Sequence, residues 1–323
     1  MYSKPLTYDS VRSVFLRMDP ILRFTLSSRL PSLRCCERNV PIFMESLSPN
    51  FNYLQVNSIK FVLKCVQKNS IILTEDQKML MHPENSRGVD FDLNKYGMCD
   101  WSVDDVLTPG DIVYPSIYDD EWEESRNQHW EMIEVLDGIL EAEGNLEVLP
   151  ETYLVFVILY EDVPIHTEYL DYGRNMAQAM KYMTSKLLGG RTIYMQEFWI
   201  QDGGVLRLPE HLSLRISSYW DTEHDFARVY NSLEKIVDPL SFPVKYLQIR
   251  NGDTFHQTEN YQHPIVRSAK YIEVNCTSKE VFWLETILKI TNLWVHWECG
   301  VPKEDIRKAV DTWLKEGREI GSD

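Results

Sequence analysis

The first forty residues alternate short, one-sided apolar stretches with prolines that interrupt them. In residues 8–18, apolar side chains recur at the three- and four-residue spacing that puts them on one face of a helix. Asp19-Pro20 ends this stretch and suits a second helix start, with Asp as N-cap and Pro at the first helical position. A further short stretch fills residues 31–41. The pattern predicts three short helices, whose apolar faces must be covered by the rest of the chain or by a partner.

Beyond these helices the apolar period changes to that of β-strands. Residues 43–73 hold short alternating runs between Asn- and Ser-rich turns, which predicts a small β-meander. Residues 75–118 are polar and carry the Gly and Pro of loops. Residues 119–143 show a broken apolar stripe at helical spacing among many carboxylates. Trp122 and Trp130 lie in this acidic segment, and they either pack on the body or face a partner.

Short strand-like units recur in the last part of the chain. The three that align best centre on Tyr246, Tyr271 and Leu293, at separations of 25 and 22 residues. One strand per 20–29 residues or so is typical of leucine-rich-repeat solenoids, although an ordinary α/β fold with coincident spacing remains the alternative. If the assumed strand phase is correct, one outward face carries Tyr246, Gln248, Tyr271, Glu273, Trp294 and His296. A face so rich in aromatic residues suits protein binding.

Charge is distributed unevenly along the chain, whose net charge is −16. Residues 1–70 contain 10 basic and 4 acidic residues, whereas residues 71–150 contain 4 basic and 20 acidic ones. A protein this acidic is a poor nucleic-acid binder, because phosphate recognition needs a basic face. The basic N-terminal segment would suit an acidic partner; alternatively, its arginines only cover solvated helix faces.

The sequence lacks patterns typical of catalysis or metal binding. Gly-x-Ser-x-Gly, His-Glu-x-x-His, Walker and Gly-x-Gly-x-x-Gly motifs are absent, and the eight histidines are scattered. The six cysteines form no Cys-x-x-Cys pair and no secretory leader is recognised, which indicates reduced thiols in an intracellular protein. Residues 153–160, the longest apolar run, are too few to span a bilayer and predict a strand buried on both faces. We therefore expect no cofactor, no metal and no membrane association.

Three stretches resemble a nematode-expanded family of F-box-like proteins. The N-terminal resemblance runs from Pro5-Leu6-Thr7-Tyr8-Asp9-Ser10 through Asp19-Pro20 to Val40-Pro41, and residues 187–191 and 313–321 are similar to the central segment and tail of that family. The resemblance implies a head that docks a Skp-type adaptor of a cullin–RING ubiquitin ligase. Together with the helical spacing it predicts an exposed docking ridge formed by Pro5, Leu6, Val11, Val14, Phe15, Met18, Leu22 and Leu26.

The sequence thus predicts an α+β or α/β protein with three parts. They are an F-box-like helical head (4–41), a β-meander with acidic loops and an acidic helix (42–150), and an irregular leucine-rich-repeat-like β/α solenoid (151–323). The expected function is that of a non-catalytic, cytoplasmic or nuclear substrate-recognition adaptor of an SCF-type ligase. Its single protein target is expected to contact Trp122, Trp130, Tyr246, Tyr271, Trp294 and His296. The alternative hypothesis is a binding module that sequesters a partner without recruiting a ligase.

Overall fold

The chain divides into two compact units, each built from strands and a few helices, so the protein is mixed α and β as the sequence predicts. The N-terminal unit is Met1–Ile193 with Gly203–Leu212, and the C-terminal unit is Tyr194–Asp202 with Ser213–Asp323. The structure is a computed structural model. It describes residues 7–68, 90–93, 100, 106–114, 151–171, 173–200, 204–221, 226–249, 260, 262–276, 293–297 and 303–315.

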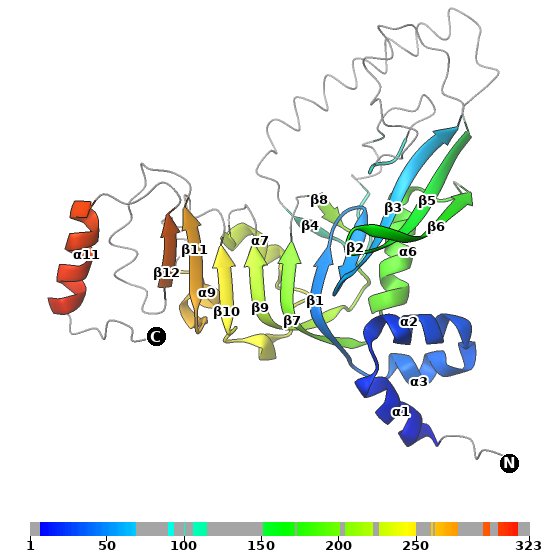
Figure 1. Ribbon diagram of the computed structural model, residues 1–323, viewed down its shortest axis with the longest axis horizontal. Helices are drawn as coiled ribbons and strands as arrows, with labels where there is room; N and C mark the ends of the chain where they lie inside the picture. The colour runs from blue at the N-terminus through cyan, green and yellow to red at the C-terminus, as the bar shows by residue number, and fades with distance from the viewer. Residues whose placement is uncertain are drawn as a thin grey trace, which may run out of the picture. The chain divides into compact units, whose positions relative to one another are not determined.

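Three short helices open the N-terminal unit and form what we call the head (Figure 1, dark blue). They are α1 (Tyr8–Arg17), α2 (Pro20–Arg29) and α3 (Arg34–Arg38), with a 3₁₀ turn at Pro31–Leu33 before α3. The predicted boundaries hold because local capping sets them. The Thr7 hydroxyl accepts a hydrogen bond from the Ser10 backbone N–H, and the Asp19 carboxylate accepts two from the second helix.

The head has a small core of its own, and this core corrects the predicted docking ridge. Phe15, which we expected on the exposed ridge, is only 2% exposed and packs with Cys36 and Val40. Val11 and Met18 are half-buried against the same cluster, because α3 covers the face of α1 that carries them. The exposed ridge residues are Val14 and Leu22, Leu26 is half-buried, and Pro5 and Leu6 lie outside the described residues.

Antiparallel strands form the body of the N-terminal unit. Their order is β1-β2-β3-β5-β6, with β1 (Ile42–Pro49), β2 (Tyr53–Val56), β3 (Ile59–Lys68), β5 (Glu151–Tyr160) and β6 (Val163–Asp171). The first three confirm the predicted meander. Two-residue turns with positive φ, such as Glu161 and Asp162, connect neighbouring strands as hairpins require.

The strand β5 differs from its prediction in two respects. Among its described side chains only Leu154 and Val155 are buried, one on each face, and the others are half-buried or exposed, so neither face is buried along its length. The cause is its antiparallel pairing between β3 and the exposed edge strand β6, in place of a central position in a parallel sheet. Because it pairs with β3 over its whole length, it belongs with the meander rather than with the parallel strands of the C-terminal unit.

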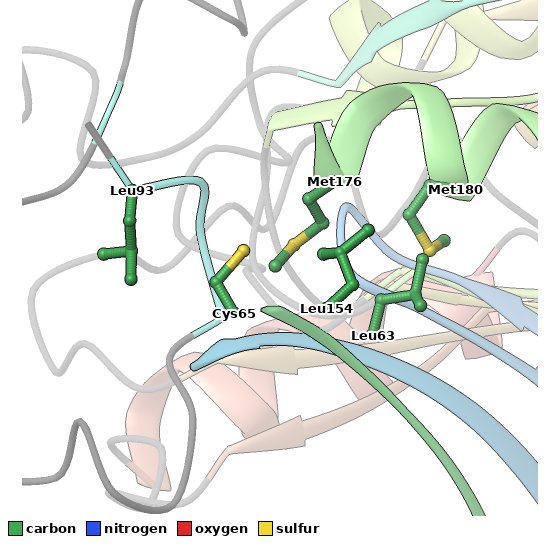
Figure 2. Packing of buried hydrophobic residues seen from close by; sticks show 6 residues of the cluster. All are labelled: Leu63, Cys65, Leu93, Leu154, Met176 and Met180. Carbon is green, nitrogen blue, oxygen red and sulfur yellow. The ribbon is translucent and has the colours of Figure 1, made fainter. Parts of the chain in front are cut away.

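One helix, α6 (Met176–Leu188), packs on β3 and closes the core of this unit. It begins one residue after its N-cap, Asn175, as predicted. The core lies between the helix and the strands in Figure 2, which shows Leu63, Cys65, Leu93, Leu154, Met176 and Met180. A two-stranded ribbon of β4 (Ile112–Tyr114) and β8 (Gly204–Leu206) completes the unit.

Parallel strands dominate the C-terminal unit. Their order is β7-β9-β10-β11-β12, with β7 (Thr192–Ile200), β9 (Ser213–Asp221), β10 (Tyr246–Ile249), β11 (Ile272–Cys276) and β12 (Leu293–Trp297). Strands β9 to β12 pair in parallel; α7 (Phe226–Leu233) lies between β9 and β10 in the chain, and α9 (Pro264–Ser268) lies between β10 and β11. The helix α11 (Lys303–Lys315) follows, close to the helix predicted over residues 302–316. No described helix is long and apolar enough to cross a membrane.

The register of these strands confirms the assumed phase. Leu247 pairs with Ile272 and both are buried, so the alternate positions Gln248 and Glu273, which also pair, lie on the opposite face. The comparison of the three units was wrong at one position. It places Leu293 beside Tyr271, whereas Leu293 pairs with Ile272. The acidic segment 119–143, with Trp122 and Trp130, lies outside the described residues.

Candidate functional site

Five aromatic side chains, which we call the aromatic row, follow one face of the parallel strands. They are Trp199, Trp220, Tyr246, Tyr271 and Trp294. Successive ring centroids lie 4.4, 5.0, 5.5 and 6.2 Å apart. The row arises because neighbouring strands of the sheet lie about 4.8 Å apart. Each of the five strands contributes one aromatic residue, in the strand or directly next to it. Such ring contacts contribute about 0.5–1.5 kcal/mol each beyond burial.

The row becomes more exposed towards its C-terminal end. Trp199 and Trp220 stack with an interplanar angle of 5° and are half-buried. Tyr271 is 39% exposed and Trp294 is 56% exposed, and their rings meet nearly at right angles, at 84°. The open end of the row is therefore the part that a partner can reach.

Polar groups line the middle of the same face. Glu273 accepts a hydrogen bond from the Tyr246 hydroxyl and another, of 3.0 Å, from the amide of Gln248. Burial raises the pKa of Tyr246, and the hydrogen bond to the Glu273 carboxylate raises it further. Burial and the same carboxylate also raise the pKa of Tyr271. Both phenols are thus held neutral, and Glu273 provides negative charge on the face.

The structure brings together most of the predicted partner-binding residues. Tyr246, Tyr271 and Trp294 lie in the row, and the backbone register puts His296 two positions beyond Trp294, opposite Asn275. Trp199 and Trp220 were not predicted from the sequence, although both end strand-like runs and are 21 residues apart. That spacing, close to the repeat found further on, could have identified them.

A second feature is a buried ionic clamp that fixes the head to the body of the N-terminal unit. Glu37 of α3 receives hydrogen bonds from Arg23 of α2 and from Arg191, which precedes β7. Their side chains are 1%, 1% and 2% exposed. Arg23 also donates to the carbonyl oxygens of Val40 and Pro41. Desolvation by burial lowers the pKa of Arg23. The negative charge of Glu37 raises that pKa, but by less, so the pKa stays below its ordinary value. The prediction that the head arginines lie on solvated faces is thus wrong for Arg23.

A third cluster, around Asp111, is structural. Its carboxylate, fully buried, accepts hydrogen bonds from Lys181 of α6 at 2.8 Å and from Arg207 at 2.9 Å. Gly110, with φ +91°, makes the turn possible, because a Cβ there would lie 2.6 Å from the Pro209 backbone. The cluster ties the β4–β8 ribbon to α6. Among the described residues, no group of three or more His, Cys, Asp or Glu side chains could hold a metal.

Asp111→Asn is expected to lower the free energy of unfolding at pH 7 by about 2–3 kcal/mol, because Lys181 and Arg207 lose their counter-charge. Burial alone would raise the pKa of Asp111, but hydrogen bonds from Lys181, Thr108 and Arg207 outweigh it and lower that pKa. The native state is therefore stabilised above the unfolded carboxyl pKa of about 3.9, and this contribution is lost as pH falls through the native value. Denaturant titrations should show the difference from wild type shrinking at acidic pH.

Asp162→Asn provides the matched control, since Asp162 is exposed in a hairpin turn whose positive φ Asn tolerates. It should leave stability within about 0.5 kcal/mol of wild type at either pH. An Asp111→Asn protein as stable as this control at pH 7 would contradict the structural role of the cluster.

Comparisons with known proteins concern the C-terminal half. Residues 175–322 match a family model described as a domain of unknown function, DUF3557. Neither the curated proteins nor the solved structures include a match to this chain. The matched segment contains the whole aromatic row and Arg191 of the clamp, and begins well after the head.

Proposed function

We propose that this chain is a non-catalytic substrate-recognition adaptor of an SCF-type ubiquitin ligase. In this proposal the head binds a Skp-type adaptor of the cullin complex, and the aromatic row binds one protein target. The observation that carries it is the presence of two distinct surfaces, one on each unit. One is a compact helical head with exposed Val14 and Leu22, and the other is an aromatic face on the C-terminal unit.

The ionic clamp supports a docking role for the head. Three helices alone bury too little surface to be a stable domain. A head that docks a partner in a fixed orientation must therefore be held to the body of the N-terminal unit by further contacts. Arg23 and Glu37 supply it within the head, and Arg191 supplies it from the body. The F-box-like character of residues 4–41 remains part of the proposal.

The fold of the C-terminal unit is proposed to be an irregular leucine-rich-repeat-like solenoid. Strands β9 to β12 are parallel, and each is followed by a segment that leads to the next in line. Successive paired residues lie 25 and 21 positions apart between β10, β11 and β12, within the range of about 20–29 for such repeats. We also propose that the protein acts in the cytoplasm or the nucleus. The aromatic face of the solenoid would there recognise a protein without a cofactor.

Leu22→Asp tests the head. Leu22 is 58% exposed on α2, so the substitution should leave the fold intact yet place a charge in any apolar interface. We expect the full chain to lose at least tenfold in affinity for a purified Skp-type adaptor, measured by biolayer interferometry. Leu240→Asp, at a similarly exposed leucine in the C-terminal unit, should bind like wild type.

Two outcomes would count against this proposal. If Leu22→Asp binds the Skp-type adaptor as strongly as Leu240→Asp, the head surface is misassigned. If wild type does not bind it at all while the aromatic row still takes a protein target, the chain is a sequestering module and not a ligase adaptor.

A further inference from the structure

We propose that the open end of the aromatic row is a binding site for an arginine side chain of the target protein. The site consists of Tyr271, Glu273 and Trp294 and is called the arginine corner below. The inference rests on the proposed function only in taking this face as the target-binding face. It adds the chemical class of the group that is recognised.

Backbone register puts the three residues together. Glu273 pairs directly with Trp294 on the neighbouring parallel strand, so the two side chains leave the sheet about 4.8 Å apart on the same face. Tyr271 lies two residues before Glu273 and therefore on that face as well. The two rings stand 6.2 Å apart at 84°, which gives two walls of a corner with a carboxylate beside them.

The charge of the corner favours a cation. Two neutral groups, the Tyr246 hydroxyl and the Gln248 amide, donate to Glu273, one to each carboxylate oxygen. No described lysine or arginine lies within ion-pair distance of Glu273. The carboxylate is thus positioned by neutral groups, retains lone pairs for further donors and has no counter-charge among the described residues.

The neighbouring amide positions the carboxylate without neutralising it. Gln248 must turn its Nε2 towards Glu273, because its oxygen would repel the carboxylate, and Oε1 of Gln248 is buried beneath the surface. A carboxylate with no basic residue paired to it among the described residues disfavours an anionic ligand. It suits a cationic group that is rich in N–H donors.

Arginine satisfies these conditions better than other side chains. Its planar guanidinium can stack on one aromatic ring while its edge donates to a carboxylate, whereas an ammonium group acts as a point charge. Trp294 is 56% exposed, so a side chain from a partner can reach its ring. The net charge of −16 also attracts basic proteins at long range.

The test uses two short peptides and the full chain. Acetyl-Gly-Arg-Gly-amide carries the guanidinium, and its citrulline counterpart is nearly isosteric but neutral. The chain is labelled with 5-fluorotryptophan, and the ¹⁹F signal of Trp294 is identified by its loss in Trp294→Phe. We expect the arginine peptide to shift this signal saturably, with a Kd of about 1–10 mM for a single side chain. At equal concentration, the citrulline peptide should produce less than a tenth of the shift.

Glu273→Gln should weaken arginine binding at least fivefold, since it removes the charge but keeps the shape of the side chain. Its amide oxygen can still accept from Gln248, and its amide N–H can donate to the Tyr246 hydroxyl oxygen. Glu168→Gln, at an exposed glutamate of β6, is the control and should bind like wild type. Equal shifts with both peptides, or no shift with either, would overturn the inference, and neither result requires the Glu273→Gln protein to fold. Binding of a Skp-type adaptor is measured separately, so failure of the corner and failure of the proposed function are distinguishable.

Discussion

Glu37→Ala is expected to lower the free energy of unfolding by about 3–5 kcal/mol, because it removes the carboxylate that pairs with two buried arginines. The substitution leaves Arg23 and Arg191, both almost fully buried, facing each other without a counter-charge. Arg23 keeps its bonds to the carbonyl oxygens of Val40 and Pro41, but those dipoles do not replace a carboxylate. Chemical denaturation followed by circular dichroism measures the loss.

Two companion variants define what the Glu37 result means. Glu37→Gln keeps hydrogen-bond acceptors and removes only the charge, so its cost should lie between those of wild type and Glu37→Ala. Glu45→Ala removes an exposed carboxylate from β1 and should change stability by less than about 0.5 kcal/mol. If Glu37→Ala proves as stable as Glu45→Ala, the clamp does not hold the head to the body.

Phe15→Ala is expected to destabilise the head by about 3–5 kcal/mol, because it empties the centre of the cluster with Cys36 and Val40. The neighbouring Val14→Ala, on the exposed side of the same helix, should cost less than about 0.5 kcal/mol. Amide hydrogen exchange in α1 and α3 separates the two, since protection should fall in the head of the Phe15 variant only.

The same pair separates a packing role from a docking role. Phe15→Ala should weaken Skp-type adaptor binding only to the extent that the head unfolds, and cooling should restore part of the binding. Exchange protection that is unchanged in Phe15→Ala would contradict the buried position of this ring. The prediction replaces the expectation that Phe15 lies on the contact surface itself.

Elements set by local chemistry were predictable from the sequence. Thr7 and Asp19 cap α1 and α2 through their own side chains, and Asn175 does the same for α6. These signals act over three or four residues, so they need no knowledge of the tertiary fold. The outward phase of β10 and β11 was also predictable, because the alternation of apolar residues survives where one face is buried.

Features set by distant residues were not predictable. Arg23 is buried because Glu37 and Arg191 meet it, and Arg191 is 154 residues from Glu37 along the chain. Whether Phe15 or Val14 faces inward depends on where α3 packs, which helical spacing does not specify. Trp199 is a separate case: its spacing from Trp220 was visible in the sequence, but the alternation of buried residues in β7 shifts by one position near Gln196 and obscures the strand pattern.

The central claim, that the head of this chain binds a Skp-type adaptor, is tested most directly by isothermal titration calorimetry of the two purified full-length proteins. We predict a saturable one-to-one heat with a Kd of about 1 µM or tighter, weakened at least tenfold by Leu22→Asp and retained by Leu240→Asp. Absence of binding heat at several temperatures, with the head shown to be folded by exchange protection in α1 and α3, would contradict the claim.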